Sequence, residues 1–193
     1  MLKKRKQSQL SGFTKDQKKY LLDIARKAIR EYLDGNFIPH KQTAESILKQ
    51  QRGAFVTLRR NGKLRGCIGQ TDAAQSVEEI VRLMAVQAAF HDWRFNPLES
   101  SELTELEIEI SILTPQKEIN NPEEIMLGRD GIALRKGGYS ALFLPQVALE
   151  NGWDLPQTLN RLCVKAGLPQ DSWKSQVQFF IFQAEIFCDA DFS

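Results

Sequence analysis

The residues best suited to chemistry lie in one short segment, Leu64-Arg65-Gly66-Cys67-Ile68-Gly69. A cysteine thiol becomes a nucleophile or redox group when a nearby positive charge stabilises its thiolate. Alternate residues of a strand share a face, so Lys63, Arg65 and Cys67 are expected on one side, where Arg65 would lower the pKa of the thiol. A structural role is the alternative, because a free cysteine is often a small buried core residue. Cys67 and Arg65 are therefore catalytic candidates.

An Asn61-Gly62 pair precedes this segment and predicts a tight β-hairpin. Both central residues of a type I′ turn have positive φ, which asparagine and glycine tolerate. The partner strands are residues 54–60 and 63–69. In the simplest two-residue hairpin register, Val56 lies opposite Cys67.

Two glycines and a basic cluster suggest ligand binding around this hairpin. Gly66 and Gly69 would let a ligand approach the backbone closely, so both are ligand-binding candidates. Four basic residues surround the turn: Arg59, Arg60, Lys63 and Arg65. Such a cluster attracts phosphate or RNA, although basic residues also protect edge strands from aggregation. The formal net charge of +2 argues against a dedicated nucleic-acid-binding protein.

A second segment, His91 to Phe95, is expected to leave a helix as a loop of charged and aromatic side chains. His91 and Asp92 are candidates for an acid/base or metal-ligating pair, or alternatively His91 only caps the helix. Asp92 is taken as a catalytic candidate, and His91 and Arg94 as ligand-binding candidates, with Asp92 and Arg94 forming the wall opposite Cys67. No residue spacing matches a metal motif, so neither a metal nor another cofactor is predicted.

Hydrophobic periodicity predicts an α+β fold in which a mainly antiparallel sheet is flanked by helices. The segment 177–186 is apolar at both parities, so we expect one interior strand covered on both sides. Helices are predicted over 14–33, about 76–90 and 155–166, and strands over 54–60, 63–69, 103–113, 131–135, 139–144 and 177–186.

Length and composition are those of one globular domain. The chain has 193 residues, 42% hydrophobic and 26% charged, from which we expect a basic flexible tail over 1–10 and a single domain over 11–193. No run approaches the roughly 18 apolar residues of a membrane span. Cys67, Cys163 and Cys188 are odd in number and lack a C-x-x-C pair, which favours a reducing cytoplasmic compartment over a disulfide framework.

Several motifs together resemble the AMMECR family. Residues 64–69 match its hallmark hexapeptide, and the resemblance continues in the same order over most of residues 13–188. Further similar segments are 92–98, the alternating strand 106–113, and the C-terminal signatures 144–148 and 152–154. Trp93 stands where the family usually has proline.

The resemblance implies a two-lobed α+β domain with a cleft, in which the hexapeptide is a catalytic or binding site. It also implies a Memo-type protein and a radical S-adenosylmethionine protein as partners. Whether the chain is an enzyme stays open. The first hypothesis is a cytoplasmic enzyme or enzyme component acting through Cys67, and the alternative is a non-catalytic module that binds a protein, an anionic ligand or RNA.

Overall fold

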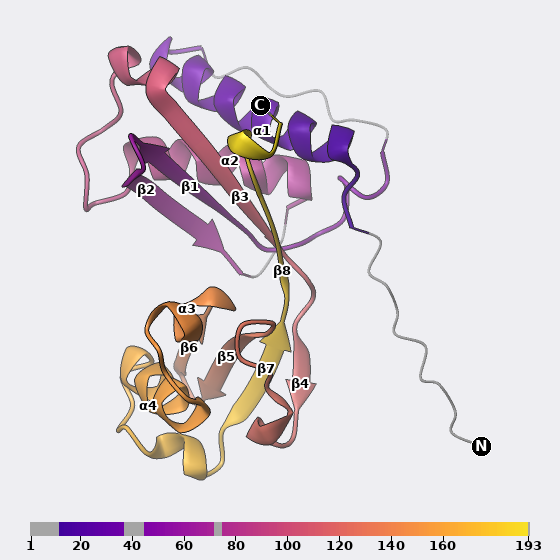
Figure 1. Ribbon diagram of the computed structural model, residues 1–193, viewed down its shortest axis with the longest axis vertical. Helices are drawn as coiled ribbons and strands as arrows, with labels where there is room; N and C mark the ends of the chain where they lie inside the picture. The colour runs from indigo at the N-terminus through magenta and orange to yellow at the C-terminus, as the bar shows by residue number, and fades with distance from the viewer. Residues whose placement is uncertain (1–11, 37–44, 72–74, 193) are drawn as a thin grey trace. The chain divides into compact units, whose positions relative to one another are not determined.

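The computed structural model describes residues 12–36, 45–71 and 75–192. The chain forms two compact units, residues 1–111 with 185–193, and residues 112–184 (Figure 1). The predicted basic tail lies outside the described residues, and the assignment of 11–193 to a single domain stays a prediction. The α+β class, with antiparallel strand pairs and flanking helices, is confirmed.

The first unit is built on a four-stranded sheet with the order β2-β1-β3-β8. The predicted hairpin is present, and β1 and β2 pair antiparallel around Asn61 and Gly62, which both have positive φ. Because β2 is the first strand in this order, one of its edges has no neighbouring strand among the described residues. The strands are β1 (Ala54–Arg60), β2 (Lys63–Gln70), β3 (Leu106–Leu113) and β8 (Ala184–Cys188).

Two helices pack in this unit, α1 (Lys15–Leu33) and α2 (Val77–Phe90). Both begin with a capping box, in which the hydroxyl of Thr14 or Ser76 accepts a hydrogen bond from the backbone amide three residues later. Helix α2 contacts β1 and β2, and α1 contacts α2 (Figure 1). A short 3₁₀ helix, η1 (Ser100–Glu105), comes before β3 and occupies residues predicted to begin that strand.

Gly66 brings the backbone of α2 against β2. A Cβ atom at this position would lie 2.1 Å from the carbonyl oxygen of Ala88 in α2. Only glycine permits this approach, because the atom in the way belongs to the helix backbone. A side chain could rotate to another rotamer, but the helix backbone cannot. The glycine therefore sets the position of α2, and of the loop after it, relative to β2.

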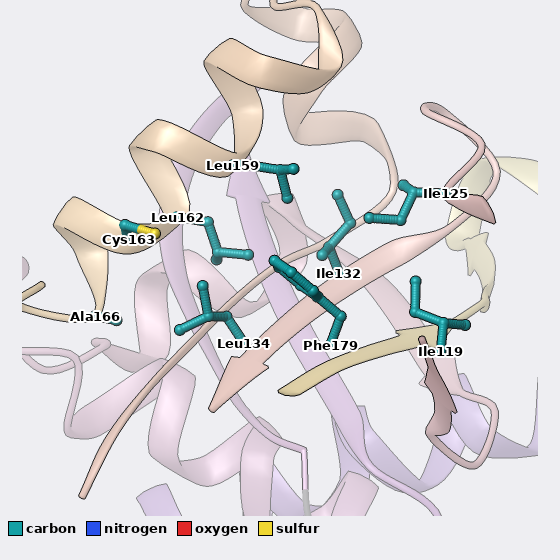
Figure 2. Close-up of a cluster of buried hydrophobic side chains, with 9 residues drawn as sticks. All are labelled: Ile119, Ile125, Ile132, Leu134, Leu159, Leu162, Cys163, Ala166 and Phe179. Carbon is teal, nitrogen blue, oxygen red and sulfur yellow. The ribbon is translucent and has the colours of Figure 1, made fainter. Parts of the chain in front are cut away.

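The second unit has a four-stranded sheet of the order β4-β7-β5-β6, with every neighbouring pair antiparallel. Its core lies between this sheet and α4, where Leu159 and Leu162 face Leu134 and Phe179 and the fully buried Cys163 belongs to the same cluster (Figure 2). Its elements are β4 (Lys117–Ile119), η2 (Pro122–Glu124), β5 (Gly131–Lys136), β6 (Tyr139–Phe143), α3 (Gln146–Glu150), α4 (Leu155–Lys165), η3 (Ser172–Lys174) and β7 (Gln178–Phe182). The last described element, η4 (Asp189–Phe192), follows β8 and belongs to the first unit.

The prediction of one interior strand over 177–186 is wrong. The segment forms two strands, β7 in the second sheet and β8 in the first, separated at Gln183. There the amide of Gln183 donates to the hydroxyl of Thr114 and its carbonyl accepts from the amide of Thr114, at 2.8 Å each. The hydrophobic pattern predicts that a segment is buried, and this holds for both strands. It does not predict to which sheet each strand belongs.

We expect Gly66→Ala to destabilise the protein by about 2 kcal/mol or more, because α2 must shift to admit the methyl group. Urea denaturation followed by circular dichroism measures this change. Gly138→Ala is the matched control, since a Cβ there meets nothing within 4 Å. Equal stability of the two variants would contradict the close approach.

Candidate functional site

The hexapeptide lies in β2, and a β-bulge changes its predicted register. Thr57, and not Val56, is opposite Cys67, because the pairing shifts by one residue between Leu58 and Arg59 and leaves Arg65 without a partner on β1. A bulge inserts one extra residue in one strand and re-aims its side chain. The simple hairpin register was therefore wrong from this point onward.

The peptide of Cys67 is held by two side chains from the loop after α2. Its amide donates to Oδ2 of Asp92 at 2.9 Å, and its carbonyl accepts from Nη2 of Arg94 at 3.1 Å. Both groups therefore point to the open edge of β2, away from β1, as in a non-hydrogen-bonded antiparallel pair. Asp92 and Arg94 thus take the place of a neighbouring strand, and we call this arrangement the Asp92–Arg94 clamp.

The clamp is itself a tightly bonded ion pair. Nε and Nη2 of Arg94 donate to Oδ1 and Oδ2 of Asp92 at 2.9 and 2.7 Å, and the amide of Arg94 adds a 3.2 Å bond to Oδ1. The side chain of Asp92 is 1% exposed and that of Arg94 is 41% exposed. These bonds, chiefly those from the Arg94 guanidinium, hold the pKa of Asp92 well below its usual range against the opposing effect of burial. A general base works best with a pKa near the operating pH, so this carboxylate is poorly suited to proton transfer.

Trp93 lies on the turn that the clamp creates. The amide of Phe95 donates to the carbonyl of Asp92 at 3.0 Å, which closes a four-residue turn with Trp93 in its second position. Proline, the residue that the family usually has there, is favoured at the second position of common β-turns. The turn is present with tryptophan at that position. The side chain of Trp93 is 90% exposed.

Arg65 binds a carboxylate that sequence reasoning did not select, Glu102 in η1. Nε and Nη2 of Arg65 donate to its two oxygens at 2.8 and 2.9 Å, in a bidentate pair. Arg60 also donates to Glu102 at 3.2 Å, and its Nε donates to Glu105 at 2.6 Å. The Arg65 guanidinium is the main cause that lowers the pKa of Glu102 to about 2. No spacing rule links residues 37 positions apart, so the sequence carried no signal for this pair.

The thiol of Cys67 is half-buried on β2, and its Sγ lies 3.3 Å from Oγ1 of Thr57. The hydrogen bonds of Arg65 go to Glu102 and to the carbonyl of Pro97, so the arginine that reaches Cys67 is Arg94. The predicted activation of the thiol by Arg65 thus finds no support in these contacts.

His91 is placed beside an aromatic pair and not beside the thiol. Its amide caps α2 by donating to Gln87 at 2.9 Å, and its Nε2 lies 3.2 Å from the hydroxyl of Tyr32. The ring of Tyr32 stacks on Phe90 with centroids 4.5 Å apart. The helix-capping alternative therefore describes His91 better than an acid/base pair with Asp92.

The two glycines of the hexapeptide have structural explanations. Gly66 admits the backbone of α2, and a Cβ at Gly69 would lie 2.1 Å from the ring of Phe55 on β1. A role for either in ligand binding stays a prediction. Within the described ranges, no group of three or more histidine, cysteine or acidic residues is arranged to hold a metal ion.

The model of the AMMECR1 family matches residues 22–187. The chain belongs to the AMMECR1 family. Its relatives include protein MK0488 of Methanopyrus kandleri, 40% identical over 184 residues, covering 90% of this chain and 89% of that one. A Thermococcus gammatolerans protein is 42% identical over 180 residues, covering 87% of this chain and 88% of that one.

A solved structure shares the fold of this AMMECR1-family chain. The crystal structure of the uncharacterised protein PH0010 from Pyrococcus horikoshii matches with a TM-score of 0.79 and 39% identity. The match covers 88% of this chain and 89% of that one. In the part of the chain that the structure describes, no helix is long and apolar enough to cross a bilayer.

We expect Asp92→Asn to lower the free energy of unfolding at neutral pH by about 2 kcal/mol, because the clamp loses its charge-assisted hydrogen bonds. The folded-state pKa of Asp92 is depressed, so its contribution is present above the unfolded pKa of about 4 and is lost as the pH falls further. Urea denaturation across this range should show the wild type and the variant converging in acid. Asp171→Asn, in an exposed ion pair with Lys174, is the control; a loss as large there would contradict the assignment.

Proposed function

We propose that this AMMECR1-family protein is a non-catalytic binding module for a protein partner, with Trp93 as its anchor. The observation that supports the proposal is the nearly complete exposure of a tryptophan on a turn held by buried hydrogen bonds. Tryptophan is the residue type most enriched among the dominant contacts of protein interfaces. An isolated protein gains nothing by exposing so much apolar surface on a rigid element.

The surroundings of Trp93 have the composition of a recognition surface. Tyr32 is partly exposed and stacked on Phe90, His91 is exposed, and the Arg94 guanidinium lies 5.5 Å from the ring centre of Phe95. Aromatic residues and arginine are enriched at interfaces. The clamp holds this turn before any partner arrives, which reduces the conformational entropy lost on binding. We call Tyr32, Phe90, His91, Trp93 and Arg94 the aromatic surface.

The family resemblance supplies two candidate partners, a Memo-type protein and a radical S-adenosylmethionine protein. We propose that one of them binds the aromatic surface. An RNA partner is less well supported, since the net charge is only +2 and Arg94 is neutralised by Asp92. We also place the protein in the reducing cytoplasm, a proposal supported by the free thiols of Cys67, Cys163 and Cys188.

The second candidate is an enzyme or enzyme component that acts through Cys67. The half-buried thiol beside the hydroxyl of Thr57 favours it, together with the nearby charge of Arg94. The contacts of Asp92 and Arg65, the other two catalytic candidates, argue against this hypothesis. The hydrogen bonds of Asp92 go to the clamp and those of Arg65 to Glu102 and Pro97, so neither is poised to move a proton at the thiol.

Trp93→Ala is expected to weaken partner binding by roughly thirtyfold, as removal of a dominant interface residue does. The measurement is biolayer interferometry with the purified Memo-type and radical S-adenosylmethionine proteins of the same organism. Tyr139→Ala, which removes another exposed aromatic ring, is the control and should bind as the wild type does. If neither protein binds the wild type, or if Trp93→Ala binds unchanged, the proposal is wrong.

Iodoacetamide should label Cys67 at neutral pH no faster than it labels an unstructured cysteine peptide. The experiment uses a Cys188→Ser background, so that the fully buried Cys163 is the only other thiol. Mass spectrometry of the labelled peptide gives the rate. A rate about tenfold above the peptide's would indicate an activated thiol and favour the enzyme hypothesis.

A further inference from the structure

A separate surface pocket lies at the tip of the β1–β2 hairpin. Its volume is about 400 Å³. It is lined by the ends of both strands, the turn and η1: Arg60, Asn61, Lys63, Leu64, Arg65 and Glu102. None of these residues belongs to the aromatic surface, so a role for this pocket is independent of the proposed function.

The charges lining this hairpin pocket are unbalanced. Arg60, Lys63 and Arg65 supply three positive charges, and Glu102 supplies one negative charge. Glu105, which pairs with Arg60 at 2.6 Å, adds a second negative charge, so one positive charge is left in excess. Both oxygens of Glu102 already accept hydrogen bonds from the two arginines. Among the described residues, the exposed ammonium group of Lys63 has no hydrogen-bond or ion-pair partner. Nη1 of Arg65 is buried without a hydrogen bond. The pocket therefore offers the Lys63 ammonium as a cationic donor without an acceptor, beside two guanidinium groups that are bonded to carboxylates.

The two guanidinium groups of the pocket are held in place before a ligand binds. Glu102 fixes the Arg65 guanidinium through a bidentate pair, and Glu105 and Glu102 hold that of Arg60. The tight turn pairs Arg60 directly with Lys63 across the hairpin. Preorganised donors lose little entropy on binding, and planar guanidinium groups match the oxygens of carboxylate and phosphate. Leu64, which is partly exposed, adds an apolar wall.

We propose that the hairpin pocket binds the oxyanion group of a small molecule, a phosphate or a carboxylate. Lys63 and the two guanidinium groups contact the anion, and Leu64 contacts the carbon skeleton attached to it. Glu102 lowers the affinity of the pocket for anions but holds the arginines in place. The ligand is therefore expected to carry more than one negative charge, enough to outweigh that carboxylate.

The test is an NMR titration of the full-length protein with pyrophosphate and, separately, with citrate at constant ionic strength. Saturable shifts of the Asn61 and Gly62 amide signals are expected for at least one probe. Pyrophosphate alone would assign the pocket to phosphate ligands, citrate alone to carboxylate ligands, and both to oxyanions in general; each result supports the proposal. Linear shifts without saturation for both probes would overturn it, as would binding of an RNA oligonucleotide without binding of either probe.

Lys63→Ala separates this pocket from general charge effects. It should weaken binding of the active probe about tenfold, and Lys63→Glu should abolish saturable shifts. Lys117→Ala removes the same charge from another exposed strand position and should bind as the wild type does. Unchanged affinity in Lys63→Ala, or an equal loss in Lys117→Ala, would overturn the proposal. Thermal unfolding of each variant confirms that it is folded before titration.

Discussion

The clamp on the Cys67 peptide is the interaction on which the first unit's surface depends. One carboxylate and one guanidinium satisfy both backbone groups of a single residue at the open edge of β2. An unpaired strand edge invites aggregation, and natural proteins commonly cover it. Here the cover is a side-chain pair, so the loop after α2 is fastened to the hairpin by hydrogen bonds and not by packing alone.

Two other contacts make this clamp possible. Gly66 lets α2 approach β2 closely, which brings the end of the helix, and therefore Asp92, within reach of the strand. The bulge leaves Arg65 without a partner on β1, and its side chain binds Glu102, which links the hairpin to η1. Arg65, Gly66 and the backbone of Cys67 thus join the hairpin to η1, α2 and the loop after α2.

The aromatic surface and the hairpin pocket differ in their chemistry. The first exposes Trp93 on a turn near other aromatic rings, which suits a protein partner, whereas the second gathers cationic groups around a small cavity, which suits an oxyanion. Each depends on a buried carboxylate that forms an ion pair with arginine: Asp92 with Arg94, and Glu102 with Arg65. Asp92 and Glu102 are ionised because arginine stabilises their charged form, and this is why they are better suited to positioning than to proton transfer.

Local pattern was sufficient for the hairpin around Asn61 and Gly62 and for the class of fold, because turns and periodicity act over a few neighbouring residues. It also brought Cys67, Asp92 and Arg94 forward as candidates. Only the tertiary structure decided that Asp92 and Arg94 grip the Cys67 backbone, that Arg65 belongs to Glu102, and that residues 177–186 serve two sheets. Those outcomes depend on which distant groups meet, and a bulge of one residue or a single break at Gln183 changes them while leaving the hydrophobic pattern unaltered.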